Sequence, residues 1–187
     1  MEIFLVTGGA RSGKSRFCIE KANSHTGRRV FIATAEALDE EMTERIIAHR
    51  AERGDSWETI EEPLKLADAI SNAAGYADVV VADCLTLWLS NLCMSMLKPD
   101  KEYVISKINE LTRTLAKVKA RGGYASIFMV SNEVGCGIVP VSNLGRFFRD
   151  MAGMLNQRVA EVADNVVLMA AGLPIYAKKD GLPVFAD

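Results

Sequence analysis

The chain has 187 residues, of which 49% are hydrophobic and 25% charged, with a formal net charge of −2. This length supports a substantial core, and we expect a single domain over residues 1–187. The near balance of charge, without a basic block, argues against nucleic-acid binding, and no apolar segment is long enough to span a bilayer. Without a signal-peptide pattern and with scattered cysteines, the chain is expected to be cytoplasmic.

The first predicted strand, at residues 3–7, leads into a glycine-rich segment that fits G-x-x-x-x-G-K-[ST] and then into a helix at residues 14–24. This context favours a phosphate-binding P-loop over an ordinary glycine-rich turn, because backbone N–H groups and a helix N-terminus would both face a polyphosphate. Lys14 is expected to reach the β- and γ-phosphates, and the Ser15 hydroxyl to bind Mg²⁺. The predicted nucleotide-binding residues here are Gly8, Gly9, Ala10, Arg11, Ser12, Gly13, Lys14 and Ser15.

A strand at residues 28–34 is followed by a helical pattern at residues 39–53. On such a helix His49 shares a face with Arg45 and Arg53. Neighbouring cations favour the neutral imidazole, which would leave one ring nitrogen free to attack a phosphate. A lone histidine is normally a surface or core residue, and the spacing by itself leaves both interpretations open.

Acidic residues follow at two further points. Glu61 and Glu62 precede Pro63, and one of them could bind a ribose or a metal ion, although a solvated turn is the default. Asp83 lies at the end of the apolar strand 78–84. An acid there is typical of a Walker B strand, which holds Mg²⁺ directly or through water, although aspartate is also a common helix N-cap. The P-loop favours the metal role.

The remaining chain continues the alternation of strands and helices. Helical patterns extend to about residue 121, a strand is predicted at 125–131, a helix at 146–163 and a strand at 165–171. Near-continuous apolar strands separated by helices are typical of a parallel sheet buried on both faces. The sequence therefore predicts an α/β fold, a three-layer P-loop NTPase (RecA-like) with a mostly parallel central sheet.

These segments together resemble a known family. The stretches "TGGARSGKS", "FIATA", "DEEMTERIIAHRAER", "VVADCLTLWLSNL" and "VSNEVGCGIVP" are similar to the bifunctional adenosylcobinamide kinase / adenosylcobinamide-phosphate guanylyltransferase of cobalamin biosynthesis, the CobU/CobP family. The resemblance runs in unbroken order from residue 3 to about residue 178. The R-I-x-x-H-x-x-x-R and SNEVGxGIVP segments are far more specific than the P-loop.

The resemblance implies an activity and a set of site residues. The family phosphorylates adenosylcobinamide with ATP or GTP, then transfers GMP from GTP to adenosylcobinamide phosphate through a GMP–histidine adduct, releasing pyrophosphate. The family's histidine matches His49, with Lys14 as the second catalytic residue and with Ser15 and Asp83 as the Mg²⁺ site. Further nucleotide contacts carried over are Ala33, Thr34, Ala35, Arg50, Ala51, Glu52, Arg53, Glu61 and Asp83.

The resemblance also implies a homotrimer. The segment at residues 137–157 contains many apolar residues, which suits a subunit interface but equally a helix that packs on its own sheet. Two other classes are weighed against the enzyme: a RecA-like ATPase that couples hydrolysis to motion or assembly, and a nucleotide-gated binding protein. The first would need basic, partner-facing loops, and the second would leave the His49 and arginine stripe unexplained. The [NT]-K-x-D element that reads guanine in GTPases is missing.

Overall fold

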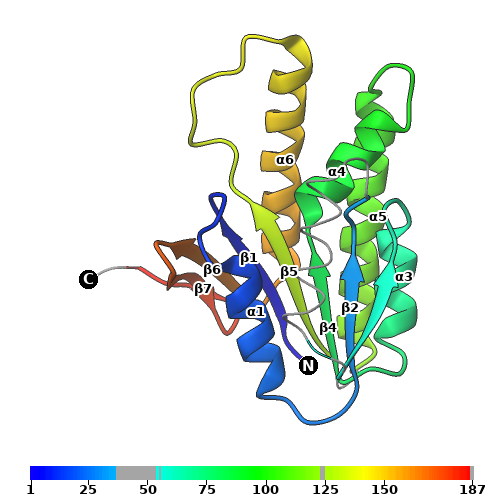
Figure 1. Ribbon diagram of the computed structural model, residues 1–187, viewed down its shortest axis with the longest axis vertical. Helices are drawn as coiled ribbons and strands as arrows, with labels where there is room; N and C mark the ends of the chain where they lie inside the picture. The colour runs from blue at the N-terminus through cyan, green and yellow to red at the C-terminus, as the bar shows by residue number, and fades with distance from the viewer. Residues whose placement is uncertain (37–53, 55, 123–124, 186–187) are drawn as a thin grey trace.

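The computed structural model describes residues 1–36, 54, 56–122 and 125–185. Its strands form one sheet in the order β3-β2-β4-β5-β1-β6-β7-β8, in which β1 to β6 pair in parallel and β7 and β8 add an antiparallel edge (Figure 1). The strands are β1 (Ile3–Gly8), β2 (Arg29–Ala33), β3 (Trp57–Glu61), β4 (Val79–Asp83), β5 (Ser126–Asn132), β6 (Asn165–Ala170), β7 (Leu173–Lys179) and β8 (Leu182–Pro183). The helices are α1 (Lys14–Asn23), α3 (Leu66–Ala73), α4 (Leu85–Met94), α5 (Lys101–Ala120) and α6 (Asn143–Val162).

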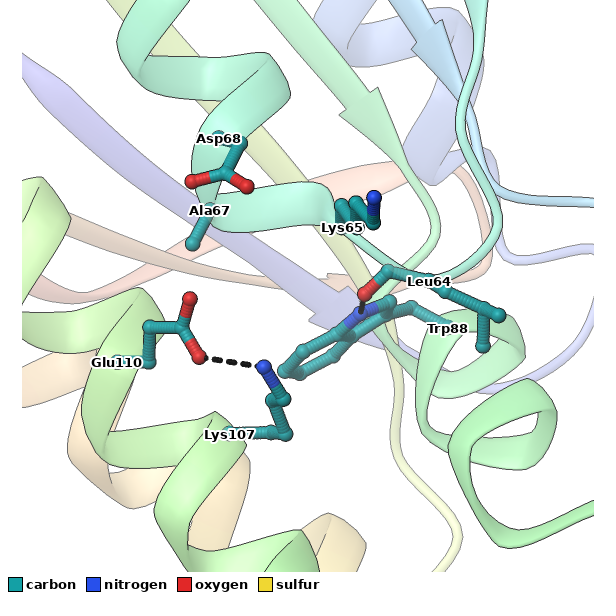
Figure 2. Close-up of a pocket in the computed structure, with 7 residues that line it drawn as sticks. All are labelled: Leu64, Lys65, Ala67, Asp68, Trp88, Lys107 and Glu110. Atoms are coloured by element: carbon teal, nitrogen blue, oxygen red, sulfur yellow. Dashed lines mark hydrogen bonds and ion pairs between the residues drawn. The ribbon is translucent and has the colours of Figure 1, made fainter. Parts of the chain in front are cut away.

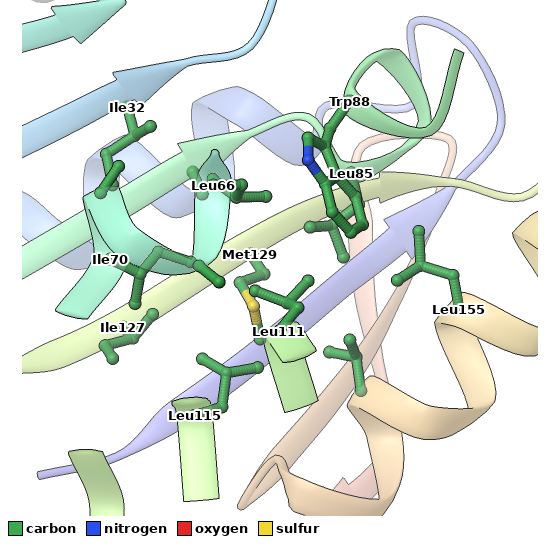
Figure 3. Close-up of a cluster of buried hydrophobic side chains, with 14 of the residues drawn as sticks. Ile32, Leu66, Ile70, Leu85, Trp88, Leu111, Leu115, Ile127, Met129 and Leu155 are labelled. Carbon is green, nitrogen blue, oxygen red and sulfur yellow. The ribbon is translucent and has the colours of Figure 1, made fainter. Parts of the chain in front are cut away.

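Helices cover both faces of the sheet, because the parallel strands are apolar on both sides. One face packs against α3, α4, α5 and α6 in the larger core cluster, where Trp88, Leu111 and Leu155 surround Met129 of the central strand β5 (Figure 3). The other face packs against α1 through Phe17 and Cys18. The structure thus has the three layers that the alternation of strands and helices predicted, and the predicted α/β fold is confirmed.

Each predicted element that lies in the described residues agrees with the structure within three residues at each end. The helical region before residue 121 is divided into α4 and α5, because Asp100 caps α5 by accepting from the N–H groups of Glu102 and Tyr103. The strand β3 and the helix α3 were not predicted, nor was the hairpin of β7 and β8. The helix predicted at residues 39–53 lies outside the described residues.

No helix in the described ranges is both long and apolar enough to cross a lipid bilayer. The four cysteines are free thiols; Cys18, Cys84 and Cys93 are buried, whereas Cys136 is exposed.

Asp164 ties the start of β6 to β1 and α5. Its carboxylate accepts from the Ile3 N–H at 2.9 Å and pairs with Lys119 Nζ at 2.5 Å. Partial burial raises the pKa of Asp164, but the bonds from Lys119 and Ile3 outweigh it, so the pKa is lowered overall. A carboxyl whose pKa is lower in the folded state stabilises the fold above its unfolded pKa and loses that contribution as the pH falls.

We expect Asp164→Asn to lower the free energy of unfolding by about 1 kcal/mol at pH 7, since the ion pair with the partly exposed Lys119 is lost. The difference should shrink as the pH falls below about 4, the ordinary pKa of an aspartate, because the unfolded chain takes up the proton before folded Asp164 does. Urea unfolding at pH 7 and pH 3 measures both values. Asp150→Asn, which removes an exposed pair with Arg149, is the matched control. An equal loss at the two pH values would contradict the assigned role.

Candidate nucleotide-binding site

The glycine-rich segment forms a tight loop between β1 and α1, at the carboxyl end of the parallel strands. Gly8 and Gly13 have φ of 150° and 94°, and Arg11 has φ of 55°. Gly13 is the N-cap of α1, whose first turn carries no acidic residue. The positive end of the helix therefore faces the loop, and no acidic side chain of the first turn itself competes with a phosphate there.

Lys14 is folded into this loop. Its side chain is buried, and Nζ donates to the Gly9 carbonyl at 2.6 Å and approaches Ser12 Oγ at 3.5 Å. Burial lowers the pKa of Lys14, and the negative charge of Asp83 opposes that shift only in part. A bound polyphosphate would stabilise the charged form of Lys14 and so raise its pKa again.

Ser15 and Asp83 meet across the site. The Ser15 hydroxyl donates to Asp83 Oδ2 at 2.5 Å, which joins the first turn of α1 to the end of β4. Two hard oxygen ligands at the phosphate loop are what Mg²⁺ prefers. The residues predicted to bind the metal are thus brought together. Asp83 is not the N-cap of α4, because that position is Cys84, whose sulfur accepts from the Leu87 N–H.

The predicted contacts on β2 and β3 lie at the same edge. In the sheet register Ala33 pairs with Glu61 on one side and with Asp83 on the other. Glu61 is exposed, so its carboxylate is available to a ligand. Thr34 is buried instead, and its hydroxyl is engaged by both the N–H and the carbonyl of Cys84, at 2.7 and 2.8 Å. Its side chain therefore holds the corner after Asp83, and its nucleotide contact stays a prediction, as does that of Ala35.

Glu62, unlike Glu61, has a structural role in its own turn. Its Oε1 accepts from the N–H groups of Leu64 and Lys65, at 3.0 and 2.8 Å, and so shapes the turn before α3. The same turn is fixed to α4, where the Trp88 indole donates to the Leu64 carbonyl at 2.9 Å. Figure 2 shows this bond beside a small hollow of about 110 Å³. Ligand pockets usually measure about 300–1,000 Å³, so this hollow is too small to be the nucleotide site.

A buried polar network behind Asp83 was not predicted from the sequence. The Asn132 amide, at the end of β5, donates to Thr86 Oγ1 at 2.8 Å, and Thr86 Oγ1 lies 3.2 Å from Cys84 Sγ. Ser131 donates in turn to Asn156 of α6 at 2.6 Å. The only signal in the sequence was the cluster of polar residues after an apolar strand. The network joins the chain just after β4 to the end of β5 and to α6, and so helps to fix the position of Asp83.

Cys84 is the nucleophilic side chain nearest to Asp83 in sequence, and the structure makes it inert. Burial and then the charge of Asp83 raise the pKa of Cys84 to about 11. The thiol is therefore protonated at neutral pH, and a protonated thiol is a weak nucleophile. The other candidate nucleophile, His49, lies outside the described residues, as do the predicted contacts Arg50, Ala51, Glu52 and Arg53.

Fold and loop together define a nucleotide-binding protein of the P-loop class. A Pyrococcus horikoshii OT3 protein superposes with a TM-score of 0.55 at 11% identity, over 98% of this chain and 91% of that one. The RadB recombinase gives 0.50 at 11% identity, over 89% and 73%. The type III secretion ATPase EscN of enteropathogenic E. coli gives 0.52 at 12%, over 91% and 43%. At such identities the likeness concerns the fold alone.

The sequence itself gives the family. Residues 4–177 match cobinamide kinase / cobinamide phosphate guanyltransferase, CobU, and the chain belongs to this family of enzymes. The bifunctional adenosylcobalamin biosynthesis protein CobP of Pseudomonas aeruginosa is 42% identical over 95% of this chain and 98% of its own length. The corresponding CobU protein of Escherichia coli K12 is 37% identical over 94% and 99%. The resemblance inferred from the motifs is confirmed.

Proposed function

We propose that this chain carries out two successive reactions in cobalamin biosynthesis at one phosphate loop. The first phosphorylates adenosylcobinamide with ATP or GTP, and the second transfers GMP from GTP to adenosylcobinamide phosphate, giving adenosylcobinamide-GDP and pyrophosphate. Family membership over residues 4–177 supports the pair of activities. The loop geometry, with Lys14, Ser15 and Asp83 converging at the N-terminus of α1, is the observation that carries the nucleotide site.

In the kinase step the chain acts mainly by position and charge. The loop N–H groups and Lys14 hold the β- and γ-phosphates, so the γ-phosphorus is presented to the substrate hydroxyl. Mg²⁺ held by Ser15 and Asp83 would offset negative charge on those phosphates. As the hydroxyl oxygen bonds to the γ-phosphorus, the bond from that phosphorus to the β-phosphate oxygen breaks and the hydroxyl proton is released to solvent. The nucleoside diphosphate leaves with negative charge on its β-phosphate, which Lys14 faces.

In the guanylyl step His49 is the nucleophile. An imidazole nitrogen bonds to the α-phosphorus of GTP as the bond to the β-phosphate oxygen breaks, so pyrophosphate leaves and a phosphoramidate remains. A phosphate oxygen of adenosylcobinamide phosphate then bonds to the same phosphorus, and the P–N bond breaks. Two displacements through a covalent intermediate are each easier than one. The high pKa of the Cys84 thiol, which is buried next to Asp83, argues against that side chain as the nucleophile.

The test is incubation of the protein with GTP labelled at the α-phosphate, followed by denaturation. A label that survives denaturation and is chased by adenosylcobinamide phosphate supports the guanylyl transfer. Hydrolysis of the γ-phosphate without covalent label or transfer to cobinamide would instead place the chain with motor-type ATPases. Nucleotide binding with neither reaction would make it a binding protein.

We further propose that the chain works as a homotrimer in the cytoplasm. The loop after β5 carries Ile138 and Val141, whose side chains are 98% and 96% exposed. Leu144 and Val139 are also exposed, whereas Met151 and Leu155 of the same apolar segment pack into their own core. Exposed aliphatic residues gathered on one loop are typical of a surface covered by another subunit.

The double variant Ile138→Asp with Val141→Asp is expected to release monomers, because two charges would be buried at the interface. Light scattering at micromolar concentration gives the mass of each form. Leu182→Asp, an equally drastic change at an exposed residue of β8, should leave the trimer intact. A wild-type mass near that of one chain would rule the trimer out.

A further inference from the structure

Two hairpin turns at the antiparallel edge of the sheet have the same backbone conformation. Ala171 and Gly172 join β6 to β7 with φ of 50° and 83°, and Asp180 and Gly181 join β7 to β8 with the same pair of values. Two-residue turns with positive φ at both positions are the type I′ kind. A Cβ atom added to either glycine would meet nothing within 4 Å, so an alanine there is strained by φ but not by a clash.

The two turns differ in what their glycine N–H binds. The Gly172 N–H donates to the Ser12 carbonyl, inside the phosphate loop, at 3.1 Å. The Gly181 N–H donates to the carbonyl of Asp164, at the opposite end of β6, at 2.8 Å. The two glycines thus have the same φ, but of the two only Gly172 donates a hydrogen bond to the phosphate loop.

The β6–β7 hairpin also contacts the glycines at both ends of the loop. A Cβ on Gly8 would lie 2.5 Å from the Met169 carbonyl oxygen, and a Cβ on Gly13 would lie 3.4 Å from Gly172 Cα. Gly8 pairs with Met169 in the sheet register. The loop is therefore held between α1 and this hairpin, and part of its need for glycine comes from the hairpin rather than from phosphate.

We propose that the β6–β7 turn is a positioning element for nucleotide binding, with Gly172 as its positioning residue. A trans peptide is planar, so its C=O and N–H point in opposite directions. By holding the Ser12 carbonyl, the Gly172 N–H turns the Gly13 N–H away from the hairpin and toward the phosphate site. The inference rests on the proposed binding of a nucleoside triphosphate to this loop.

Gly172→Ala tests the proposal with Gly181→Ala as its matched control. An L side chain relaxes away from φ of 83°, so the turn shifts and the hydrogen bond to Ser12 is lost. We expect Gly172→Ala to raise the Kd for Mg·GTP and Mg·ATP, measured by calorimetry, about tenfold, the effect of one misdirected N–H on a charged ligand. Gly181→Ala should leave both Kd values within about twofold of the wild type. Both variants should lower the unfolding temperature of the nucleotide-free protein alike.

Gly172→Asn supplies a rescue, because asparagine tolerates positive φ and would keep the N–H in place. It should bind both nucleotides nearly as tightly as the wild type. If Gly172→Ala and Gly181→Ala give the same Kd values, whether unchanged or raised, Gly172 has no positioning role. If the wild type itself binds neither nucleotide, the proposed function fails instead, and the two failures are distinguished by that first measurement.

Discussion

Lys14→Ala is expected to lower the rates of both reactions by about 10²–10³, the usual effect of removing one electrostatic group from a transition state. Nζ lies inside the loop, 2.6 Å from the Gly9 carbonyl, where the phosphates of either nucleotide would be held. Since folding lowers the pKa of Lys14, the buried ammonium opposes folding at neutral pH. The variant should therefore unfold at a temperature close to that of the wild type, and lost activity would not reflect lost structure.

The two reactions can be measured separately for this variant. Kinase turnover is followed with Mg·ATP and adenosylcobinamide, and guanylyl transfer with adenosylcobinamide phosphate supplied directly. Lys21→Ala removes an exposed lysine from the last turn of the same helix and should leave both rates unchanged. A variant at Lys14 that kept normal kinase turnover while losing guanylyl transfer would show that the two reactions use different phosphate sites.

The parts of the fold that could be predicted are those that depend on local pattern. Residues 3–6 and 79–82 are apolar throughout, a composition typical of a strand buried on both faces. The P-loop was equally readable, because its glycines, lysine and serine occupy fixed positions between a strand and a helix. These features place Lys14, Ser15 and Asp83 at one edge without any knowledge of long-range contacts.

The parts that could not be predicted depend on partners distant in sequence. β3 is half-buried and carries Glu58 and Glu61, so its composition is that of a surface segment until β2 is beside it. No local pattern indicated that the Thr34 hydroxyl would form a hydrogen bond with Cys84, which is 50 residues away in sequence. The turn at Asp180 and Gly181 did have a signal, since the dipeptide Asp-Gly favours a type I′ hairpin turn. The contact of Gly172 with Ser12 had none.

His49→Asn is expected to abolish guanylyl transfer, by at least about a thousandfold, while much of the kinase rate is kept. Loss of a covalent nucleophile commonly costs more than that. The kinase step needs only the loop, Lys14 and the metal ligands, so it should continue and adenosylcobinamide phosphate should accumulate. Label from α-labelled GTP should be stable to base and labile to acid, as a phosphoramidate is, and should be absent from the variant.

His25→Asn is the matched control, because the chain has two histidines. His25 follows α1, which runs back from the loop, and its ring lies edge-on to Phe128 with centroids 6.3 Å apart. It is therefore at the end of the sheet away from the phosphate loop, and its removal should leave labelling and transfer unchanged. Equal labelling of the wild type and His49→Asn would assign the nucleophile to another residue. Since burial keeps Cys84 protonated, that residue would then be one other than Cys84.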